Sequence, residues 1–387
     1  MNIVLLSLLF IVIIIVIIDW IPMLNTWQSR IKIGQFTSFE DWKNKVRNTS
    51  AIWLNKTPTI KVTDNTRVII IDIVRGNYKR NAIQSWQQGA LLLGLSNYVK
   101  QTNDVKTKNQ ITAFMNSKLD DKGNWKRELK EVDEVLLTYA VLKTPDFDIQ
   151  KNKPAIEATY DLIKKLIGKD GTIAYRSNYT NYRLVDTIGF ISPFLVRYGL
   201  QFDNNEAVQL GINQIREFNK YAMLDANFIP CHSYDINLKS PIGLFGWGRG
   251  LGWYSIGLID AWLELPDNHP DKNELTQMVI KLAKAAIQYQ KENGSWSWII
   301  MSHEKQNDSS TTAILSWFLS NAASISEIKN ECNTAKEKAL QYLKQVTRRN
   351  GAIDFSQGDT KSIGVYSQHF DILPFTQGFC LRTLYSN

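Results

Sequence analysis

Apolar residues recur every three or four positions along most of the chain, which is the period of an amphipathic α-helix. The clearest such segments are SWQQGALLLGLSNYV, AIEATYDLIKKLIG, LVDTIGFISPFLVRYG and ELTQMVIKLAKAAIQYQ. Counting every segment with this spacing predicts about eleven or twelve helices. Strand-like alternation is confined to RVIIIDIV at residues 67–74. The pattern therefore predicts an all-α domain.

Similar loops separate these helices. DKGNW, DGTIAY, NGSWSW and NGAIDF begin at residues 121, 170, 293 and 350, and a degenerate copy, ANFIPC, lies near residue 227. Asp-Gly and Asn-Gly favour turns with positive φ, followed here by extended residues. The intervals between copies are 49, 57, 66 and 57 residues, about one helical hairpin each. The spacing predicts a repeat of helical hairpins.

The end of the chain distinguishes two arrangements of such repeats. An open solenoid needs polar capping repeats at both ends. The last predicted helix, TQGFCLRTLYS, is apolar almost to the end of the sequence. We therefore expect a closed (α/α)6 toroid of six helical hairpins.

A long apolar segment precedes this domain. Every residue from Ile3 to Ile18 except Ser7 is apolar, and Trp20 and Trp27 suit an interfacial aromatic belt. A cleaved signal peptide is the alternative, but no basic residue precedes the segment and no small-residue cleavage site follows it. We expect one uncleaved transmembrane helix. The predicted divisions are a membrane anchor at 1–23, a juxtamembrane stalk at 24–50 and the six-hairpin domain at 51–387.

The side of the membrane on which the domain lies stays open. Basic residues follow the predicted span, whereas only the terminal amine precedes it, which favours a cytoplasmic domain. Long domains can override that bias. The expected location is the bacterial cytoplasmic membrane, with a single pass through the lipid bilayer.

Charge and composition limit the classes of molecule that this chain is expected to bind. The chain has a net charge of +8, which suits an acidic partner, but its Lys and Arg residues lack the dense clusters typical of nucleic-acid binding. Its 3 cysteines and 4 histidines are scattered, without the spacing of a metal site. We expect an acidic oligo- or polysaccharide as partner, no nucleic acid, no metal and no cofactor.

Two carboxylates are candidates for catalysis. Asp186 lies inside the apolar stretch RLVDTIGFISPF, where burial would raise its pKa toward that of a general acid at neutral pH. Asp133 opens DEVLLTYAVL and is either a second catalytic acid or a helix cap. Asp308, before TTAILSWFL, also has the position of a helix cap.

Four further residues are candidates for substrate binding. Arg249, between two glycines in GLFGWGRGLGW, can reach a pocket and bind a carboxylate, and Trp247 and Trp253 offer flat faces for a sugar ring. His232 in PCHSYD either contacts a substrate hydroxyl or is an ordinary loop histidine.

These motifs resemble a known family. WGRGLGW is similar to the W-x-R-G-N-G-W motif of the unsaturated glucuronyl and rhamnogalacturonyl hydrolases, six-hairpin enzymes of glycoside hydrolase families 88 and 105. LVDTIGFISPFL resembles the helix that carries their catalytic acid/base, and this resemblance gives that role to Asp186. DEVLLTYAVL resembles the segment of their second catalytic aspartate, here Asp133. CHSYD is similar to their substrate-site histidine loop, and SWQQGALLLGL to a substrate-site helix, so His232 and Trp86 are expected to bind substrate.

The resemblance also implies an activity. In this family the aspartate protonates the double bond of an unsaturated uronic acid and then assists the addition of water. We therefore expect a membrane-anchored glycoside hydrolase acting on an acidic saccharide. Leu251 stands where the motif has Asn, Asp308 where Glu is usual, and Leu184 and Val185 where a Trp precedes the aspartate. The alternative is a module that binds or processes polysaccharide during surface-polysaccharide biosynthesis without this hydrolase activity. A sugar epimerase would need paired histidines.

Overall fold

The computed structural model describes residues 3–58, 60–61, 71, 74, 78–79, 84–302 and 304–386. The predicted strand at 67–74 lies largely outside the described residues.

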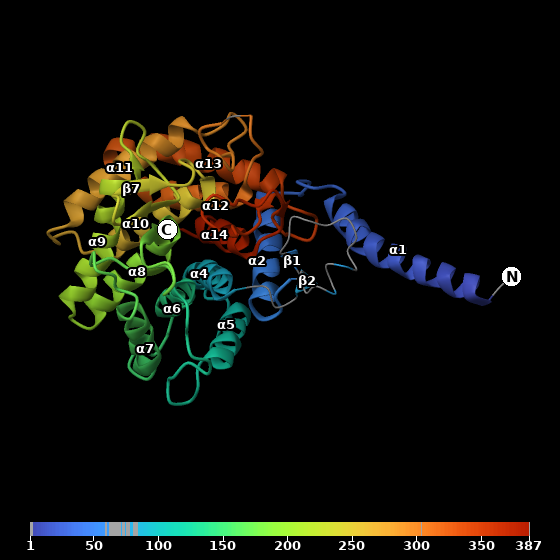
Figure 1. The fold of residues 1–387 in the computed structure, drawn as a ribbon, viewed down its shortest axis with the longest axis horizontal. Coiled ribbons are helices and arrows are strands. Elements are labelled where there is room, and N and C mark those ends of the chain that lie inside the picture. Colours follow the sequence, from blue (N-terminus) through green and yellow to red (C-terminus); the bar gives the residue numbers. More distant parts are fainter. Residues whose placement is uncertain are drawn as a thin grey trace.

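Six helices form a closed ring at the centre of the domain (Figure 1). Each helix of the ring contacts the next one along the chain, and the last contacts the first. Most of their residues are buried, which explains why their sequences are apolar on more than one face. The inner helices are α4 (Ser85–Thr102), α6 (Val135–Leu142), α8 (Val185–Gln201), α10 (Gly248–Glu264), α12 (Ser309–Ala322) and α14 (Pro374–Leu384).

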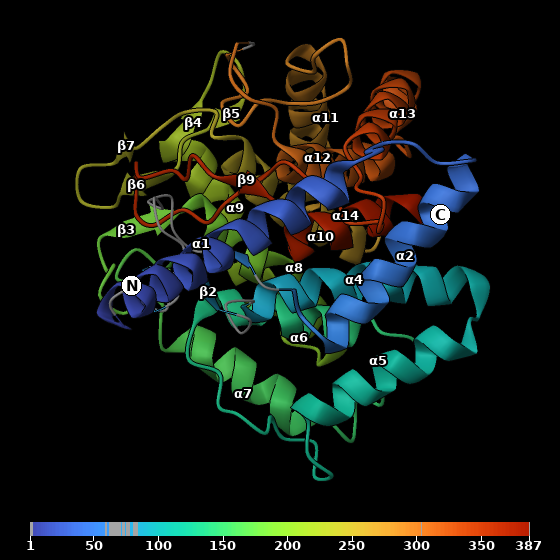
Figure 2. The ribbon, with the colours of Figure 1, turned by 90° about the vertical axis from the view of Figure 1, so that its right-hand side faces the viewer.

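A second layer of helices surrounds the ring (Figures 1 and 2). Each outer helix buries one apolar face against the ring and exposes a polar face, which is the pattern that the three-to-four spacing predicted. The outer helices are α2 (Phe39–Asn55), α5 (Val105–Lys118), α7 (Lys153–Lys164), α9 (Asn205–Ala222), α11 (Lys272–Gln288) and α13 (Lys329–Gln345). Two 3₁₀ turns, Val132–Glu134 and Ser326–Ile328, precede α6 and α13.

Helix α2 corrects the predicted stalk at 24–50. It packs against α14, α4 and α5 and so supplies the outer helix of the sixth hairpin. Trp42, Val46 and Leu54 are fully buried, and the indole N–H of Trp42 donates to Thr347 Oγ1 at 2.9 Å. These apolar residues are spaced at helical intervals along one face. The stalk prediction was wrong from residue 39 onward because the polar outer face of α2 resembles that of a solvated helix.

The repeated loops join each outer helix to the next inner helix. The predicted turns are confirmed, because Gly123, Gly171, Gly294 and Gly351 all have positive φ, between 72° and 90°. The degenerate copy contains β5 (Ile229–Pro230), which pairs antiparallel with β4 (Met223–Leu224) just before it. A side chain on Gly351 would lie only 2.4 Å from the carbonyl oxygen of Lys45 in α2. The last repeated turn therefore packs directly on the N-terminal helix.

Short strands gather near the N-terminal ends of the inner helices. The strands β3 (Tyr182–Leu184), β6 (Ser233–Asp235) and β7 (Ser240–Ile242) form one antiparallel sheet with β6 in the middle. A hairpin pairs β8 (Ser356–Gln357) with β9 (Phe370–Asp371), and a further pair is β1 (Ile60–Lys61) with β2 (Tyr78–Lys79). The segment 358–369 between β8 and β9 is called the hairpin loop below.

Helix α1 (Ile3–Arg30) extends away from the domain (Figure 1). It is the one helix in the described ranges that is long and apolar enough to cross a membrane, with a mean hydropathy of 3.2 over an 18-residue window and none of that window buried. A signal sequence near the N-terminus has the same properties. Its last turn is fastened to the domain, because Arg30 forms a bidentate pair with Asp354 at 2.6 and 3.0 Å.

Candidate active site

A cavity of about 780 Å³ lies near the N-terminal ends of the inner helices. This volume is in the range of small-molecule sites. Residues from four inner helices, or the turns just before them, line it, together with the loop before β3 and the hairpin loop. All seven predicted site residues line this one cavity, namely Trp86, Asp133, Asp186, His232, Trp247, Arg249 and Trp253.

Asp186 lies in the first turn of α8. The positive end of the helix dipole favours an ionised carboxyl there, and Arg249 acts in the same direction. Burial outweighs both and raises the pKa of Asp186 to about 7. Its Oδ2 atom has no hydrogen-bond partner within the described residues. The side chain is thus a cavity-lining carboxyl that is half protonated near neutral pH.

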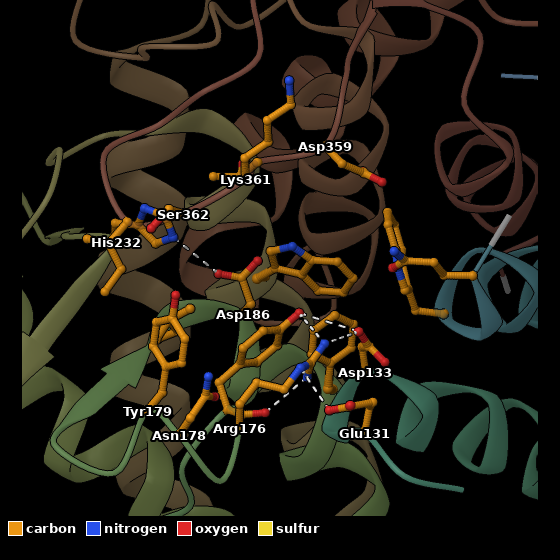
Figure 3. A pocket seen from close by; sticks show the side chains of 18 of the residues that line it. Glu131, Asp133, Arg176, Asn178, Tyr179, Asp186, His232, Asp359, Lys361 and Ser362 are labelled. Atoms are coloured by element: carbon orange, nitrogen blue, oxygen red, sulfur yellow. Dashed lines mark hydrogen bonds and ion pairs between the residues drawn. The ribbon is translucent and has the colours of Figure 1, made fainter. Parts of the chain in front are cut away.

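His232 lies beside Asp186 (Figure 3). Its Nε2 atom is 3.8 Å from Asp186 Oδ2, and its Nδ1 atom is 3.0 Å from the hydroxyl of Tyr366. Burial, helped by the charge of Arg249, lowers the pKa of His232 to about 4. The imidazole is therefore neutral at physiological pH, a state in which one ring nitrogen donates and the other accepts.

Asp133 is held by an ion pair. Arg176 donates to its Oδ2 at 2.7 Å and also pairs with Glu131 at 2.8 Å (Figure 3). The hydroxyl of Tyr175 lies 3.4 Å from the same oxygen of Asp133. Asp133 sits in the 3₁₀ turn before α6, but Glu131 and Glu134 form the capping box there. The capping role that the sequence left open for Asp133 thus falls to its neighbours.

Arg249 makes contacts that the sequence did not predict. Arg249 is 2% exposed, and its guanidinium donates to the backbone carbonyls of Gln357 and Gly358, the latter at 2.6 Å. Asp359 lies 4.0 Å from the same guanidinium. Arg249 therefore fastens the base of the hairpin loop as well as bringing a positive charge to the cavity wall.

Several aromatic rings line the cavity. Trp253 packs against Phe190, Phe375 and Trp86, with ring centroids 4.3, 4.7 and 5.5 Å apart. Trp253 is 2% exposed and Trp86 5% exposed. Much of the flat surface predicted for sugar stacking is thus occupied by neighbouring rings.

Several cavity residues were missed by the sequence analysis. Arg176, Asn178 and Tyr179 precede β3, and Asp359, Lys361 and Ser362 come from the hairpin loop (Figure 3). Both segments follow a predicted turn and lead into an inner helix. Their position in the repeat could have identified them, because all segments that join a repeated turn to an inner helix meet at the same end of the ring.

Two departures from the motif lie outside this cavity. Leu251 is fully buried in α10 and is not among the lining residues. Asp308 caps α12, as the sequence analysis allowed, by accepting from the backbone N–H groups of Ser310 and Thr311. It also accepts from Gln357 N at 2.9 Å, so the cap holds the hairpin as well. Within the described residues, no group of three His, Cys, Asp or Glu side chains is placed to hold a metal ion.

Comparison with known proteins identifies related chains. Residues 59–382 match the model of Glycosyl Hydrolase Family 88. The unsaturated rhamnogalacturonyl hydrolase YesR of Bacillus subtilis (strain 168) is 19% identical over 240 residues, covering 60% of this chain and 69% of that protein.

Solved structures share the fold. A possible member of the GH105 family from Salmonella enterica serovar Paratyphi A superposes with a TM-score of 0.74 at 16% identity, covering 91% of this chain and 95% of the other. The unsaturated glucuronyl hydrolase of Bacillus sp. GL1 gives a TM-score of 0.65 at 15% identity, with 92% and 96% covered.

Proposed function

This chain belongs to glycosyl hydrolase family 88, and from this premise we propose that its cavity binds the terminal unsaturated uronic acid of an acidic oligosaccharide and releases it by hydrolysis. The observation that carries the proposal is the placement of Asp186. Its carboxyl lines the cavity, one of its oxygens is unpaired, and its pKa of about 7 lets it act as both acid and base.

The expected reaction follows from this carboxyl. Protonated Asp186 donates its proton to C4 of the C4=C5 enol ether, which leaves an oxocarbenium ion at C5. The Asp186 carboxylate then takes a proton from water as the water oxygen bonds to C5. The hemiketal opens to a C5 ketone, and C1 becomes an aldehyde as the neighbouring sugar leaves with a proton. One water is consumed and Asp186 regains its proton.

The remaining cavity residues support binding and orientation. Asp133 is fixed by Arg176, and its proposed role is to accept from sugar hydroxyls as a second carboxylate. Arg249 and Lys361 supply positive charge at the wall, which favours an acidic sugar. His232, Trp247, Trp253 and Trp86 complete the proposed substrate contacts.

An assay on unsaturated uronyl disaccharides tests this proposal. Loss of the double-bond absorbance is expected for the wild-type protein. We expect Asp186→Asn to lower kcat by about 10²–10⁴-fold, the usual contribution of a general acid or base. Asp225→Asn, at an exposed position, is the matched control and should retain full activity.

Two results would refute the proposal. One is full activity of Asp186→Asn. The other is an inactive wild-type protein on rhamnogalacturonyl and glucuronyl disaccharides alike. Saturable binding of the saccharide without turnover would favour the alternative of a module that binds or processes polysaccharide during its biosynthesis.

We also propose that α1 is a retained single-pass membrane anchor. Its apolar side chains are exposed along the helix, as lipid contact requires. Retention is supported by the docked last turn, where Arg30 pairs with the buried carboxylate of Asp354 and Arg349 N donates to Ser29 O at 3.3 Å. Cleavage of a signal peptide would remove Ser29 and Arg30, or would cut the chain close to them.

Fractionation tests the anchor. The full-length protein should stay in the membrane pellet after alkaline carbonate extraction, and sequencing of the mature protein should begin at or next to Met1. A soluble mature protein that lacks the apolar segment would show that α1 is a cleaved signal. Protease protection of the domain in sealed vesicles would establish which side of the membrane it occupies.

A further inference from the structure

Tyr366 links the hairpin loop to His232. It lies between β8 and β9, and its ring packs against those of His232 and Trp247, with centroids 5.4 and 5.3 Å apart. Its hydroxyl is 3.0 Å from His232 Nδ1. It also accepts from the backbone N–H of Leu244 at 3.1 Å. Tyr366 does not line the cavity itself, so any effect it has on substrate passes through His232.

The direction of the Tyr366–His232 hydrogen bond follows from these partners. Leu244 N–H is a donor, so the hydroxyl oxygen of Tyr366 acts as acceptor toward it. The hydroxyl hydrogen then needs an acceptor of its own, and in the described part of the chain His232 Nδ1 is the one within hydrogen-bond distance. If Nδ1 accepts, the single proton of the neutral imidazole must be on Nε2.

We propose that Tyr366 is a positioning residue that holds His232 in its Nε2–H tautomer, so that this N–H faces Oδ2 of Asp186. This inference rests on the proposed function for its catalytic meaning, although the tautomer itself can be measured without it. The two atoms are 3.8 Å apart, and Asp186 Oδ2 has no other partner in the described structure.

The proposed tautomer suits the two steps of the reaction. When Asp186 has given up its proton, its carboxylate gains a neighbouring N–H donor that stabilises the new charge. An Nε2 atom that already carries a proton cannot compete with Asp186 for the proton of water. The opposite tautomer would place a lone pair against the carboxylate and disfavour its ionised form.

Nuclear magnetic resonance tests the tautomer directly. Because the chain has only 4 histidines, long-range ¹⁵N–¹H spectra of ¹⁵N-histidine-labelled full-length protein are simple, and contacts to the Trp247 ring identify His232. The expected spectrum shows a proton on Nε2 and a bare Nδ1. A proton on Nδ1 in the wild-type protein overturns the proposal, whether or not the protein hydrolyses uronyl disaccharides.

Tyr366→Phe tests the consequence for catalysis. We expect kcat to fall by about 10-fold with KM nearly unchanged, the lower end of the effect seen for groups that orient metal-ligating histidines. The His232 spectrum should change to a mixture of tautomers. Tyr254→Phe is the matched control, because it also removes a buried, hydrogen-bonded hydroxyl, but that hydroxyl donates to Asn219, which does not line the cavity. Equal kcat values for the two variants, or an unchanged His232 tautomer in Tyr366→Phe, would contradict the role of Tyr366.

Discussion

The closure of the ring depends on a close approach of α4 and α14, which can be tested by adding one methyl group between them. A Cβ atom on Gly378 of α14 would lie 2.3 Å from both the carbonyl carbon and oxygen of Ala90 in α4. From the other side, a Cβ on Gly94 would lie 2.4 Å from Gly378 O. Ordinary contacts begin near 3.4 Å, so Gly378→Ala forces the two backbones apart by roughly 1 Å.

The expected cost follows from two opposing effects. Overpacking against rigid backbone costs about 3 kcal/mol or more, at the upper end of its usual range. Replacing a helical Gly by Ala returns about 1 kcal/mol through helix propensity. The net loss is about 2 kcal/mol, which in a domain of this size lowers the melting temperature by roughly 3 °C.

Gly252→Ala in α10 is the matched control for this measurement. Its Cβ would meet Ile314 Cδ1 at 2.5 Å, the far end of a flexible side chain that can rotate away. Both variants gain the same helix propensity, so circular dichroism melting curves of the full-length proteins isolate the backbone clash. A Gly378→Ala protein at least as stable as Gly252→Ala would refute the close contact between α4 and α14, and with it the closed ring.

Three further predictions concern the N-terminal helix and the carboxyls. Trp42→Ala should destabilise the domain by about 3–5 kcal/mol because it empties a fully buried site. The control Ile52→Ala, on the exposed face of α2, should change stability by less than about 0.5 kcal/mol. Equal midpoints of urea unfolding for the two variants would support the interpretation of α2 as a juxtamembrane stalk. Although burial opposes ionisation, His369, whose Nε2 lies 3.6 Å from Asp371 Oδ2, and the paired Arg348 hold the pKa of Asp371 at about 2. Its contribution to stability is therefore present above its ordinary pKa of about 3.9 and is lost as pH falls toward 2. Melting curves between pH 5 and 2 should therefore fall less steeply for Asp371→Asn than for the wild type. Because Asp186 must be protonated to donate, kcat/KM should fall about tenfold per pH unit above pH 7, and a profile that is flat to pH 9 would exclude it as the acid.

The helices and turns could be predicted because their causes are local. Three-to-four apolar spacing requires helices with buried faces, and the Asp-Gly and Asn-Gly dipeptides require the positive φ found at Gly171 and Gly351. The candidate site was also predictable in part. Asp133, Asp186 and His232 follow repeated loops within about 16 residues, and the ring brings the ends of these loops to one side.

Other features of the site depend on partners far away in the sequence. Arg249 was expected to bind a substrate carboxylate, but its guanidinium donates to carbonyls more than one hundred residues further along the chain. Tyr366 had no motif to mark it, because its role depends on contact with a histidine 134 positions away. No spacing rule in a single sequence reports such contacts.

The sequence by itself determined the class of fold, the repeated turns and the two candidate aspartates, because each depends on residues within a few positions of one another. Only the tertiary structure decided that α2 belongs to the domain. Gly351 packs on the backbone of Lys45 in the way that Gly294 packs on Lys338 in α13, so the last repeat uses the first helix of the domain as its outer partner. A ring has no free end, and its closing contact therefore joins segments that the sequence places at opposite ends of the domain.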